Sequence, residues 1–225
     1  MIDKVVSINR AMENIHDGMT LMISGFAQGG SPRHLIKAVS ETGVKNLSTI
    51  SDDLGLNHRG FQQTIAALIN NHQISKAKCS FLGQNKEAST QYVNGELEVE
   101  FIPMGTFAER IRCGGCGIGG FLTKTGVGTL IEEGKQTLVV DGEKYILETP
   151  LTAEVALIKA WKADRFGNAI FRYNSVNFNK VMAMAADTVI LEVEEIVDTG
   201  TIEPDQVELP GVFVDYIVVS DEEVL

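Results

Sequence analysis

A glycine-rich segment follows the first apolar run of the chain. Residues 19–23 predict a short buried strand, and the segment after them contains Ser24, Gly25, Phe26, Ala27, Gln28, Gly29 and Gly30. Ser31 is a good N-cap, and Pro32 fits the first position of a helix. Glycines let a backbone turn tightly and approach a ligand, and free N–H groups at a helix start attract anions. The segment therefore predicts either an anion-binding loop at the carboxyl end of a strand or an ordinary tight turn.

The glycine spacing matches neither of two nucleotide-binding motifs. It is not the Gly-x-Gly-x-x-Gly of dinucleotide-binding proteins, and no Gly-Lys-Ser/Thr follows it. An NAD-binding oxidoreductase module that uses residues 24–30 is still an alternative, because Asp52 or Asp53 follows the second expected strand and could hold a ribose. A sugar-phosphate isomerase of similar layered architecture is another, but it needs a base and phosphate-binding lysines, and we find no such constellation.

Helical and strand-like patterns alternate through the first hundred residues and would position this loop. Apolar residues three and four apart predict helices over residues 7–15, 32–39 and 61–69, and Gly43 is placed to end the second. Strands are expected over residues 47–50, 74–82 and 97–102, with a short helix over 86–93. This alternation is typical of βαβ units, in which helices cover both faces of a parallel sheet.

The second half of the chain is richer in strand patterns. Residues 137–149 predict a hairpin that turns at Asp141-Gly142. Further strands are expected over residues 155–160, 170–173, 188–193 and 212–219, with a helix over 179–186. No linker or repeat divides the chain. The sequence therefore predicts one α/β domain over residues 1–225, a mainly parallel sheet sandwiched by helices, with β-rich additions in the second half.

Net charge and composition exclude several classes of partner. The chain has 225 residues and a net charge of −11, which disfavours binding to nucleic acid or to an anionic membrane surface. Its first residues include Asp3 and lack the apolar core of a signal peptide, and its longest uncharged stretch, residues 18–32, contains glycines and ends in proline. We therefore expect a cytoplasmic protein with no membrane segment.

Cysteines and paired acids are weaker candidates for chemistry. Three cysteines are too few for a disulfide framework. Zinc needs four ligands, and the four histidines are too scattered to complete a site with Cys113 and Cys116. A redox pair needs a helix behind it, whereas more glycines follow here, so we interpret Cys113-Gly-Gly-Cys116 as a tightly packed glycine-rich turn. Glu132-Glu133 and the acidic residues at 192–195 are interpreted as solvated surface, and no metal is expected.

Motifs spread over the whole chain carry a family resemblance. The first consists of Asp17-Gly18, the apolar run 19–23, Gly25-Phe26 and Gly30-Ser31-Pro32. The others are residues 94–100, Gly105-Thr106, residues 109–112, Gly114-Gly115, residues 125–129, residues 159–164, Gly167-Asn168, residues 177–179 and Pro210-Gly211. Together they resemble the A (alpha) subunit of class I coenzyme A transferases, the 3-oxoacid, acetate and butyrate–acetoacetate enzymes. Ser24 departs from that pattern by replacing the first glycine of the usual Gly-Gly-Phe.

This resemblance implies an enzyme that moves CoA from an acyl-CoA to a carboxylate. In the family, the partner B (beta) subunit provides a glutamate that attacks the thioester and becomes a glutamyl-CoA thioester. That glutamate lies in a Glu-Asn-Gly context, which this chain lacks, since its only Glu-Asn is Glu13-Asn14 on an expected helix. The resemblance therefore implies no catalytic nucleophile in this chain and CoA contacts from residues 24–30. It also implies acyl-CoA and short carboxylate substrates, no permanently bound cofactor, and a hetero-oligomer with equal numbers of alpha and beta subunits.

Two residues depart from the family pattern at positions that resemble ones lining the acyl site. Met104 stands where members usually have glutamine, and Asp52 stands where they often have asparagine. A thioether cannot donate a hydrogen bond, whereas an amide can. Losing a donor aimed at a developing oxyanion costs roughly 2.7–4 kcal/mol. Either that donor is unnecessary here, or the acyl substrate differs from the usual short 3-oxo acids.

Overall fold

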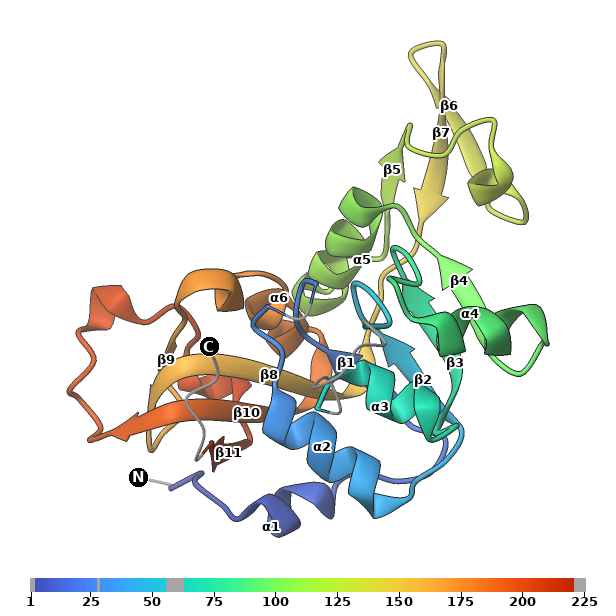
Figure 1. The fold of residues 1–225 in the computed structure, drawn as a ribbon. Coiled ribbons are helices and arrows are strands. Elements are labelled where there is room, and N and C mark those ends of the chain that lie inside the picture. The colour runs from blue at the N-terminus through green and yellow to red at the C-terminus, as the bar shows by residue number, and fades with distance from the viewer. Residues whose placement is uncertain (1–2, 28, 56–62, 221–225) are drawn as a thin grey trace.

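A parallel sheet forms the centre of the protein. The computed structural model describes residues 3–27, 29–55 and 63–220. The sheet has the strands β1 (Thr20–Ile23), β2 (Leu47–Ile50), β3 (Ile74–Cys79), β4 (Glu98–Phe101), β8 (Ala153–Asp164), β9 (Ala169–Ile170), β10 (Ala186–Val197) and β11 (Tyr216–Val219). Their order is β11-β10-β8-β1-β2-β3-β4, all parallel, and β9 pairs antiparallel with β8. Strand order therefore reverses between β1 and β8, in the middle of the sheet (Figure 1).

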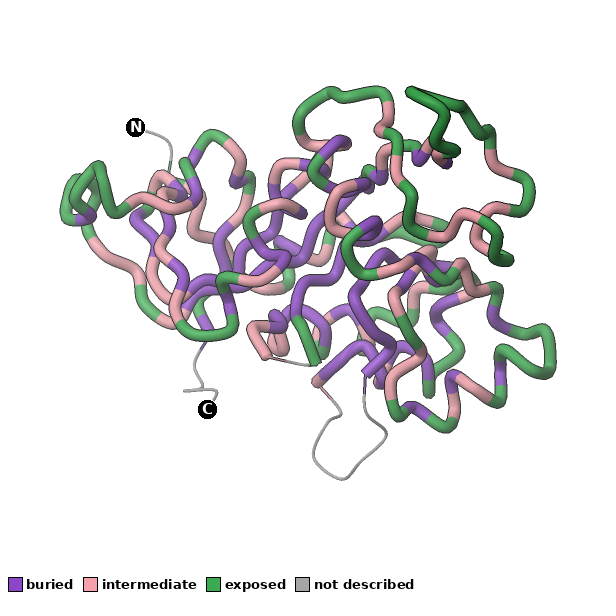
Figure 2. Tube along the Cα trace, turned by 90° about the horizontal axis from the view of Figure 1, so that it is seen from above, coloured by how far each residue is buried: buried purple, intermediate pink, exposed green. Residues whose placement is uncertain are grey.

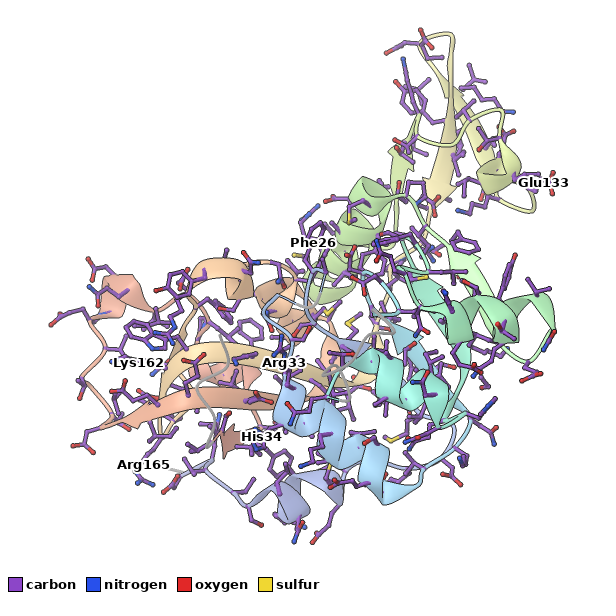
Figure 3. All side chains as sticks on the ribbon, viewed as in Figure 1. Phe26, Arg33, His34, Glu133, Lys162 and Arg165 are labelled. Atoms are coloured by element: carbon purple, nitrogen blue, oxygen red, sulfur yellow. The ribbon has the colours of Figure 1, made fainter. Side chains whose placement is uncertain are left out.

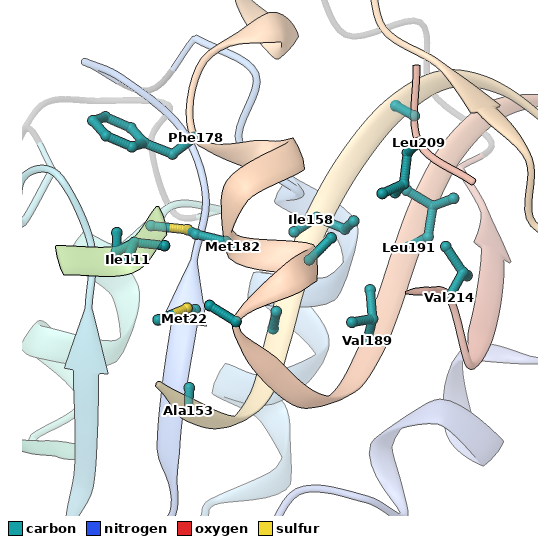
Figure 4. Close-up of a cluster of buried hydrophobic side chains, with 14 of the residues drawn as sticks. Met22, Ile111, Ala153, Ile158, Phe178, Met182, Val189, Leu191, Leu209 and Val214 are labelled. Atoms are coloured by element: carbon teal, nitrogen blue, oxygen red, sulfur yellow. The ribbon is translucent and has the colours of Figure 1, made fainter. Parts of the chain in front are cut away.

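Helices cover both faces of this sheet, as the sequence predicts. One face carries α1 (Ile8–Met12), α2 (Arg33–Thr42), α3 (Ile65–Asn70) and α4 (Lys86–Val93), and the other carries α5 (Met104–Cys116) and α6 (Asn179–Met184). Side chains of β1 alternate between the two cores: Leu21 and Ile23 pack toward α1–α4, and Met22 packs with Ile111 and Met182 (Figure 4). Buried residues gather in the middle of the molecule (Figure 2), where β1 and most of β8 lie, whereas the edge strand β4 is exposed or half-buried.

Local signals in the sequence act as expected at several helix ends. The Ser7 side chain accepts a hydrogen bond from the Arg10 N–H (3.3 Å) and caps α1. Gly43 ends α2 in the left-handed conformation (φ +76°). Helix α4 has the predicted bounds, whereas the predicted helix over 61–69 appears as α3, and its residues 61 and 62 lie outside the described ranges.

A second, antiparallel sheet projects from the main body as an arm (Figure 1). It contains β5 (Phe121–Thr123), β6 (Thr137–Val140) and β7 (Glu143–Glu148) in the order β5-β7-β6. The predicted hairpin is confirmed: β6 and β7 are joined at Asp141 and Gly142, which both have positive φ (+50° and +78°).

The interpretation of residues 113–116 as a glycine-rich turn is wrong. They form the last turn of α5, and Gly117 follows as its C-cap in the left-handed conformation (φ +66°). A Cβ on Gly114 would lie 2.1 Å from the Leu151 carbonyl oxygen, and one on Gly115 would lie 2.8 Å from the Met184 Cβ. Close packing of this helix thus outweighs the low helix propensity of glycine, which is why the sequence pattern missed α5.

The described residues contain no disulfide bond and no cluster of side chains suited to a metal ion. Cys79, Cys113 and Cys116 are free thiols. Within the described ranges, no three His, Cys, Asp or Glu side chains are grouped so that they could hold a metal ion. No helix in these ranges has the length and hydropathy needed to span a bilayer.

Other differences concern the ends of the predicted elements. Strands β8 and β10 each have twelve residues and extend beyond the predicted ranges. The strand expected over 170–173 shrinks to β9, and a 3-10 helix, Tyr173–Val176, follows it. The strand expected over 212–219 begins with another 3-10 helix, Gly211–Phe213, before β11.

Candidate functional site

The carboxyl ends of β1, β2 and β3 meet beside the point where strand order reverses. Open α/β sheets bind ligands at this place. The glycine-rich loop, residues 24–32, follows β1, and Asp52 and Asp53 follow β2. A cavity of about 20 Å³ lies between these two segments, bounded by residues that include Ser24, Gly25 and Asp52. The structure therefore brings together the loop and the acidic pair that the sequence singled out.

The glycine-rich loop is folded on itself and tied to the next loop. Phe26 and Gly29 exchange two backbone hydrogen bonds (3.0 and 2.8 Å). The Ala27 N–H donates to Asp53 Oδ2 (3.0 Å), and Asp53 Oδ1 accepts from the Gly55 N–H (2.6 Å). Each oxygen of Asp53 therefore accepts a backbone N–H, so this carboxylate joins the glycine-rich loop to the segment after β2.

Exposure in this loop is confined to its tip. Phe26 is 46% exposed, and Figure 3 labels it together with Arg33, the first residue of α2. Ser24, at the base of the loop, is buried. Gln28, which the sequence also places in the binding loop, lies outside the described residues.

Asn179, fully buried at the start of α6, holds the base of the loop. Its Oδ1 accepts from the Ser24 hydroxyl (2.5 Å) and from the Lys159 N–H of β8 (2.6 Å). Its Nδ2 donates to the carbonyl oxygens of Gly30 (3.1 Å) and Ser175 (3.0 Å). One side chain thus connects both ends of the glycine segment to β8 and to the 3-10 helix Tyr173–Val176.

Close internal packing explains why two positions of the loop require glycine. A Cβ on Gly30, which has φ +72°, would lie 2.7 Å from the Ser175 Cα. A Cβ on Gly29 would lie 2.5 Å from the Asn174 Nδ2. These glycines let the loop approach the 3-10 helix, so a valine at position 29 would first crowd Asn174.

Helix α2 begins one residue later than predicted. Pro32 occupies the N-cap, and no side chain caps the helix from that position, so the predicted capping role of Ser31 is wrong. The Arg33 N–H instead donates to the Ser31 carbonyl oxygen, and the Ile36 N–H donates to that of Pro32.

The anion that the helix start attracts is a carboxylate of the same chain. Glu192 Oε2, from β10, accepts hydrogen bonds from the N–H groups of His34 (2.8 Å) and Leu35 (3.1 Å). The N–H groups of His34 and Leu35 in the first turn therefore bond to the chain itself and are not free donors for a ligand anion. The interpretation of residues 192–195 as solvated surface is also wrong for Glu192, which is fully buried.

Glu192 belongs to a buried charge network next to the loop. Burial raises its pKa to about 7, although the bonds from Leu35 and His34 and the charge of Lys159 oppose the rise. Lys159 Nζ lies 3.9 Å from Glu192 Oε1 and 3.5 Å from Glu194 Oε1, and Glu194 also pairs with Arg172. A pocket of about 330 Å³ opens over this network.

Asp52 differs from its neighbour Asp53 in its surroundings. It is 1% exposed, and among the described residues neither of its carboxylate oxygens finds a hydrogen-bond partner within normal bonding distance. Burial, followed by the charge of Asp53, raises its pKa to about 6, and the nearby Ser80 side chain offsets part of that rise. The Ser80 N–H donates to the Asp52 carbonyl oxygen (2.8 Å), and the Ser80 hydroxyl lies 3.6 Å from Met104 Sδ. The two departures from the family pattern therefore both contact Ser80.

Sequence reasoning missed two residues that organise this region. Asn179 stands out in the sequence only as part of the 177–179 motif, and Glu192 falls among acids interpreted as surface. A signal exists for Glu192, because it is the one charged residue in the apolar run 188–193 of an expected strand.

Similarity to known proteins covers the whole described fold. Residues 5–220 match the family model described as coenzyme A transferase. The chain is 43% identical to the alpha subunit of acetate CoA-transferase from Escherichia coli K12, over 99% of both chains. It is 44% identical to the alpha subunit of acetoacetyl-CoA:acetate/butyrate CoA transferase from Clostridium acetobutylicum (97% of this chain, 98% of the relative). It is 49% identical to the A subunit of succinyl-CoA:3-ketoacid coenzyme A transferase from Xanthomonas campestris strain B100 (92% and 84%).

Solved structures share the fold at lower identity. An acyl-CoA transferase from Escherichia coli O157:H7, in a thioester complex with CoA, superposes with a TM-score of 0.86 at 24% identity. The alignment covers 98% of this chain and 48% of that one, so this chain spans about half of that protein. Glutaconate coenzyme A-transferase from Acidaminococcus fermentans gives a TM-score of 0.82 at 17% identity (96% and 75%). These similarities give the oxidoreductase alternative no support.

Proposed function

Because the chain belongs to the coenzyme A transferase family, we propose that it is the alpha subunit of a two-subunit enzyme that moves CoA between a short-chain acyl-CoA and a carboxylic or 3-oxo acid. The observation that carries this proposal is near full-length identity of 43–44% with chains that are named alpha subunits. Acetate, butyrate and acetoacetate are the acids that we expect, which assigns the enzyme to short-chain fatty acid and acetoacetate metabolism.

The covalent chemistry is assigned to the partner beta subunit. Its glutamate carboxylate attacks the thioester carbonyl and expels the CoA thiolate, leaving a mixed anhydride. The thiolate then attacks the glutamyl carbonyl, which releases the donor acid and forms a glutamyl-CoA thioester. The acceptor carboxylate reverses these two steps. This division of labour agrees with the lack of a Glu-Asn-Gly in the present chain.

The role proposed for this chain is to hold the acyl-CoA. We assign CoA contacts to Ser24, Gly25, Phe26, Ala27, Gln28, Gly29 and Gly30. Support comes from the position of the loop at the reversal of strand order and from the half-exposed Phe26 at its tip. The contacts with Asp53 and Asn179 preorganise the loop, so little ordering is required when a ligand binds.

The proposal includes an assembly and a location. We assign residues 1–225 to one alpha-subunit domain that assembles with beta subunits in equal numbers, as in a heterotetramer, in the cytoplasm. CoA thioesters act as substrates, and no permanently bound cofactor is required.

Reconstitution tests the proposal. The chain is purified alone and together with its beta subunit, and CoA transfer from butyryl-CoA or acetyl-CoA to acetoacetate is measured. Transfer is expected only from the two subunits together. Transfer by the purified single chain would contradict the division of labour, and binding of NADH without any response to CoA esters would favour the oxidoreductase.

A further inference from the structure

Strand β6 is an open edge of the projecting arm (Figure 1). The arm sheet has the order β5-β7-β6, so among the described strands β6 pairs with β7 alone. Its residues, Thr137–Val140, are all exposed and uncharged, and Val139 is 71% exposed. Edge strands of natural proteins usually carry charges, prolines or bulges that prevent pairing with another chain. An exposed, uncharged edge rich in β-branched residues is instead suited to pair with a further strand.

The other edge strands of the described chain are protected in one of these ways or covered. Strand β4 carries Glu98 and Glu100, whose carboxylates pair with Lys76 (3.0 Å) and Lys78 (3.5 Å) of β3. Strand β11 is covered by the N-terminal segment, since the Val6 N–H donates to its backbone (2.9 Å). Strand β5 has only three residues. The same chain that protects these edges therefore leaves β6 open.

The hydrogen-bond pattern of the β6–β7 hairpin shows which backbone groups face outward. The Leu147 N–H donates to the Gln136 carbonyl oxygen (2.9 Å), so these residues form a hydrogen-bonded pair. In an antiparallel ladder such pairs alternate with pairs whose N–H and C=O groups point away from the partner strand. In the register of β6 and β7, the outward groups are therefore those of Thr137 and Val139.

We propose that β6 pairs antiparallel with β6 of a second copy of this chain, so that the two arms form one continuous sheet. The outward groups fit when Leu138 faces Leu138 of the second copy, because Thr137 then exchanges hydrogen bonds with Val139 of that copy. This register also places Lys135 of one copy opposite Asp141 of the other. Opposite charges therefore meet at both ends of the paired strands, which favours a second copy as the occupant.

An apolar face of the arm is extended by the same pairing. Gly126 packs against Ile131 and Ile146 on one face of the arm sheet, which covers that face. Leu122 and Leu138 lie on the opposite face and are 38% and 37% exposed. In the proposed pair, Leu138 contacts Leu138 of the second copy at a position without backbone hydrogen bonds, where cross-strand side chains are closest.

This inference deepens the proposed function and rests on it for the presence of beta subunits. It assigns the contact between the two alpha subunits of the heterotetramer to the arm, and not to the glycine-rich loop that is proposed to bind CoA (Figure 1).

Cysteine crosslinking of the two-subunit enzyme tests the register. In the proposed pair the Cα atoms of the two Leu138 residues lie about 4.5 Å apart, within the range of about 4.4–6.8 Å that a disulfide spans. The exposed native thiol is removed by Cys116→Ser. In that background, Leu138→Cys should form a disulfide between two copies of this chain under mild oxidation. Val140→Cys is the matched control and should form none, because the two Val140 residues are displaced along the strands by about 13 Å.

Proline substitution tests the backbone pairing separately. The Val139 N–H points away from β7, so Val139→Pro keeps the hairpin and blocks the open edge. Light scattering coupled to size-exclusion chromatography should show that the mass of the two-subunit enzyme falls by half, from two alpha subunits to one. Val139→Thr keeps the N–H and should leave the mass unchanged.

Several results overturn the inference. These are a wild-type complex with a single alpha subunit, equal crosslinking by Leu138→Cys and Val140→Cys, and an unchanged mass in Val139→Pro. Loss of the beta subunit from Val139→Pro, with no disulfide in Leu138→Cys, also overturns it, because the edge then holds the beta subunit. Crosslinking needs no turnover, so a complex that forms the disulfide but transfers no CoA overturns the proposed function alone. CoA transfer without the disulfide overturns this inference alone.

Discussion

Replacing Asn179 with alanine should destabilise the protein more than any other single polar deletion near the loop. The change leaves four groups without their partner: the Ser24 hydroxyl, the Lys159 N–H and the carbonyl oxygens of Gly30 and Ser175. Each buried group that loses its partner costs about 1–3 kcal/mol, and water can enter the vacated space and recover part of this. We therefore expect the free energy of unfolding to fall by about 3–5 kcal/mol, a large share of the 5–15 kcal/mol typical of a domain.

Urea denaturation of the purified chain measures this change. Asn14→Ala is the matched control, because the Asn14 amide makes a single hydrogen bond, to the Ala11 carbonyl oxygen (3.0 Å), and should cost about 1 kcal/mol or less. In the two-subunit enzyme, Asn179→Ala should also lower kcat/KM at least tenfold, since the loop loses its anchor. If Asn179→Ala unfolds at the same urea concentration as Asn14→Ala, the view of Asn179 as the anchor of the loop is refuted.

Three further predictions concern the same region. Folding raises the pKa of Asp52 from 3.8 to about 6, so the wild type should lose stability as pH rises from about 4 to 6. Asp52→Asn should therefore be more stable than the wild type by about 1–3 kcal/mol at pH 7. Equal urea midpoints of the two proteins at pH 7 contradict this prediction. Glu192→Ala removes the carboxylate that accepts the N–H groups of α2 and should cost about 2 kcal/mol or more, whereas Glu192→Gln keeps an acceptor and should cost less than half as much; equal losses in the two variants contradict the capping role. Gly30→Ala should lower the free energy of unfolding by about 2 kcal/mol or more, because the added Cβ meets Ser175. Gly18 has a similar φ (+79°) but open space around it, so Gly18→Ala should lower the free energy of unfolding by only about 1 kcal/mol. Thermal unfolding of both variants checks this difference, and equal shifts in Tm contradict it.

Features with local causes could be predicted from the sequence. Helix α4 and the β6–β7 hairpin follow from short-range patterns and from turn residues that tolerate positive φ. The parallel sheet with helices on both faces follows from the alternation of strand and helix periods. Helix α5 does not follow, because Gly114 and Gly115 argue against a helix until their contacts with Leu151 and Met184 are known.

The internal partners of the loop could not be read from the sequence. Glu192 is separated from His34 by 158 residues, and Asn179 is separated from Ser24 by 155. A glycine-rich loop before a helix predicts a site for an anion in general, and only the folded chain shows that its own carboxylate occupies the helix start. The position of the loop at the carboxyl end of a strand was predictable, because the glycine-rich segment directly follows an apolar strand pattern in the sequence.

Trapping the covalent intermediate tests most directly whether this chain holds the acyl-CoA while its partner carries out the attack. The two-subunit enzyme is incubated with butyryl-CoA, reduced with borohydride, and digested for peptide mass spectrometry. The reduced glutamate is predicted to lie on a peptide of the beta subunit, with every peptide of this chain unmodified. A reduced carboxylate within residues 1–225 would contradict the account.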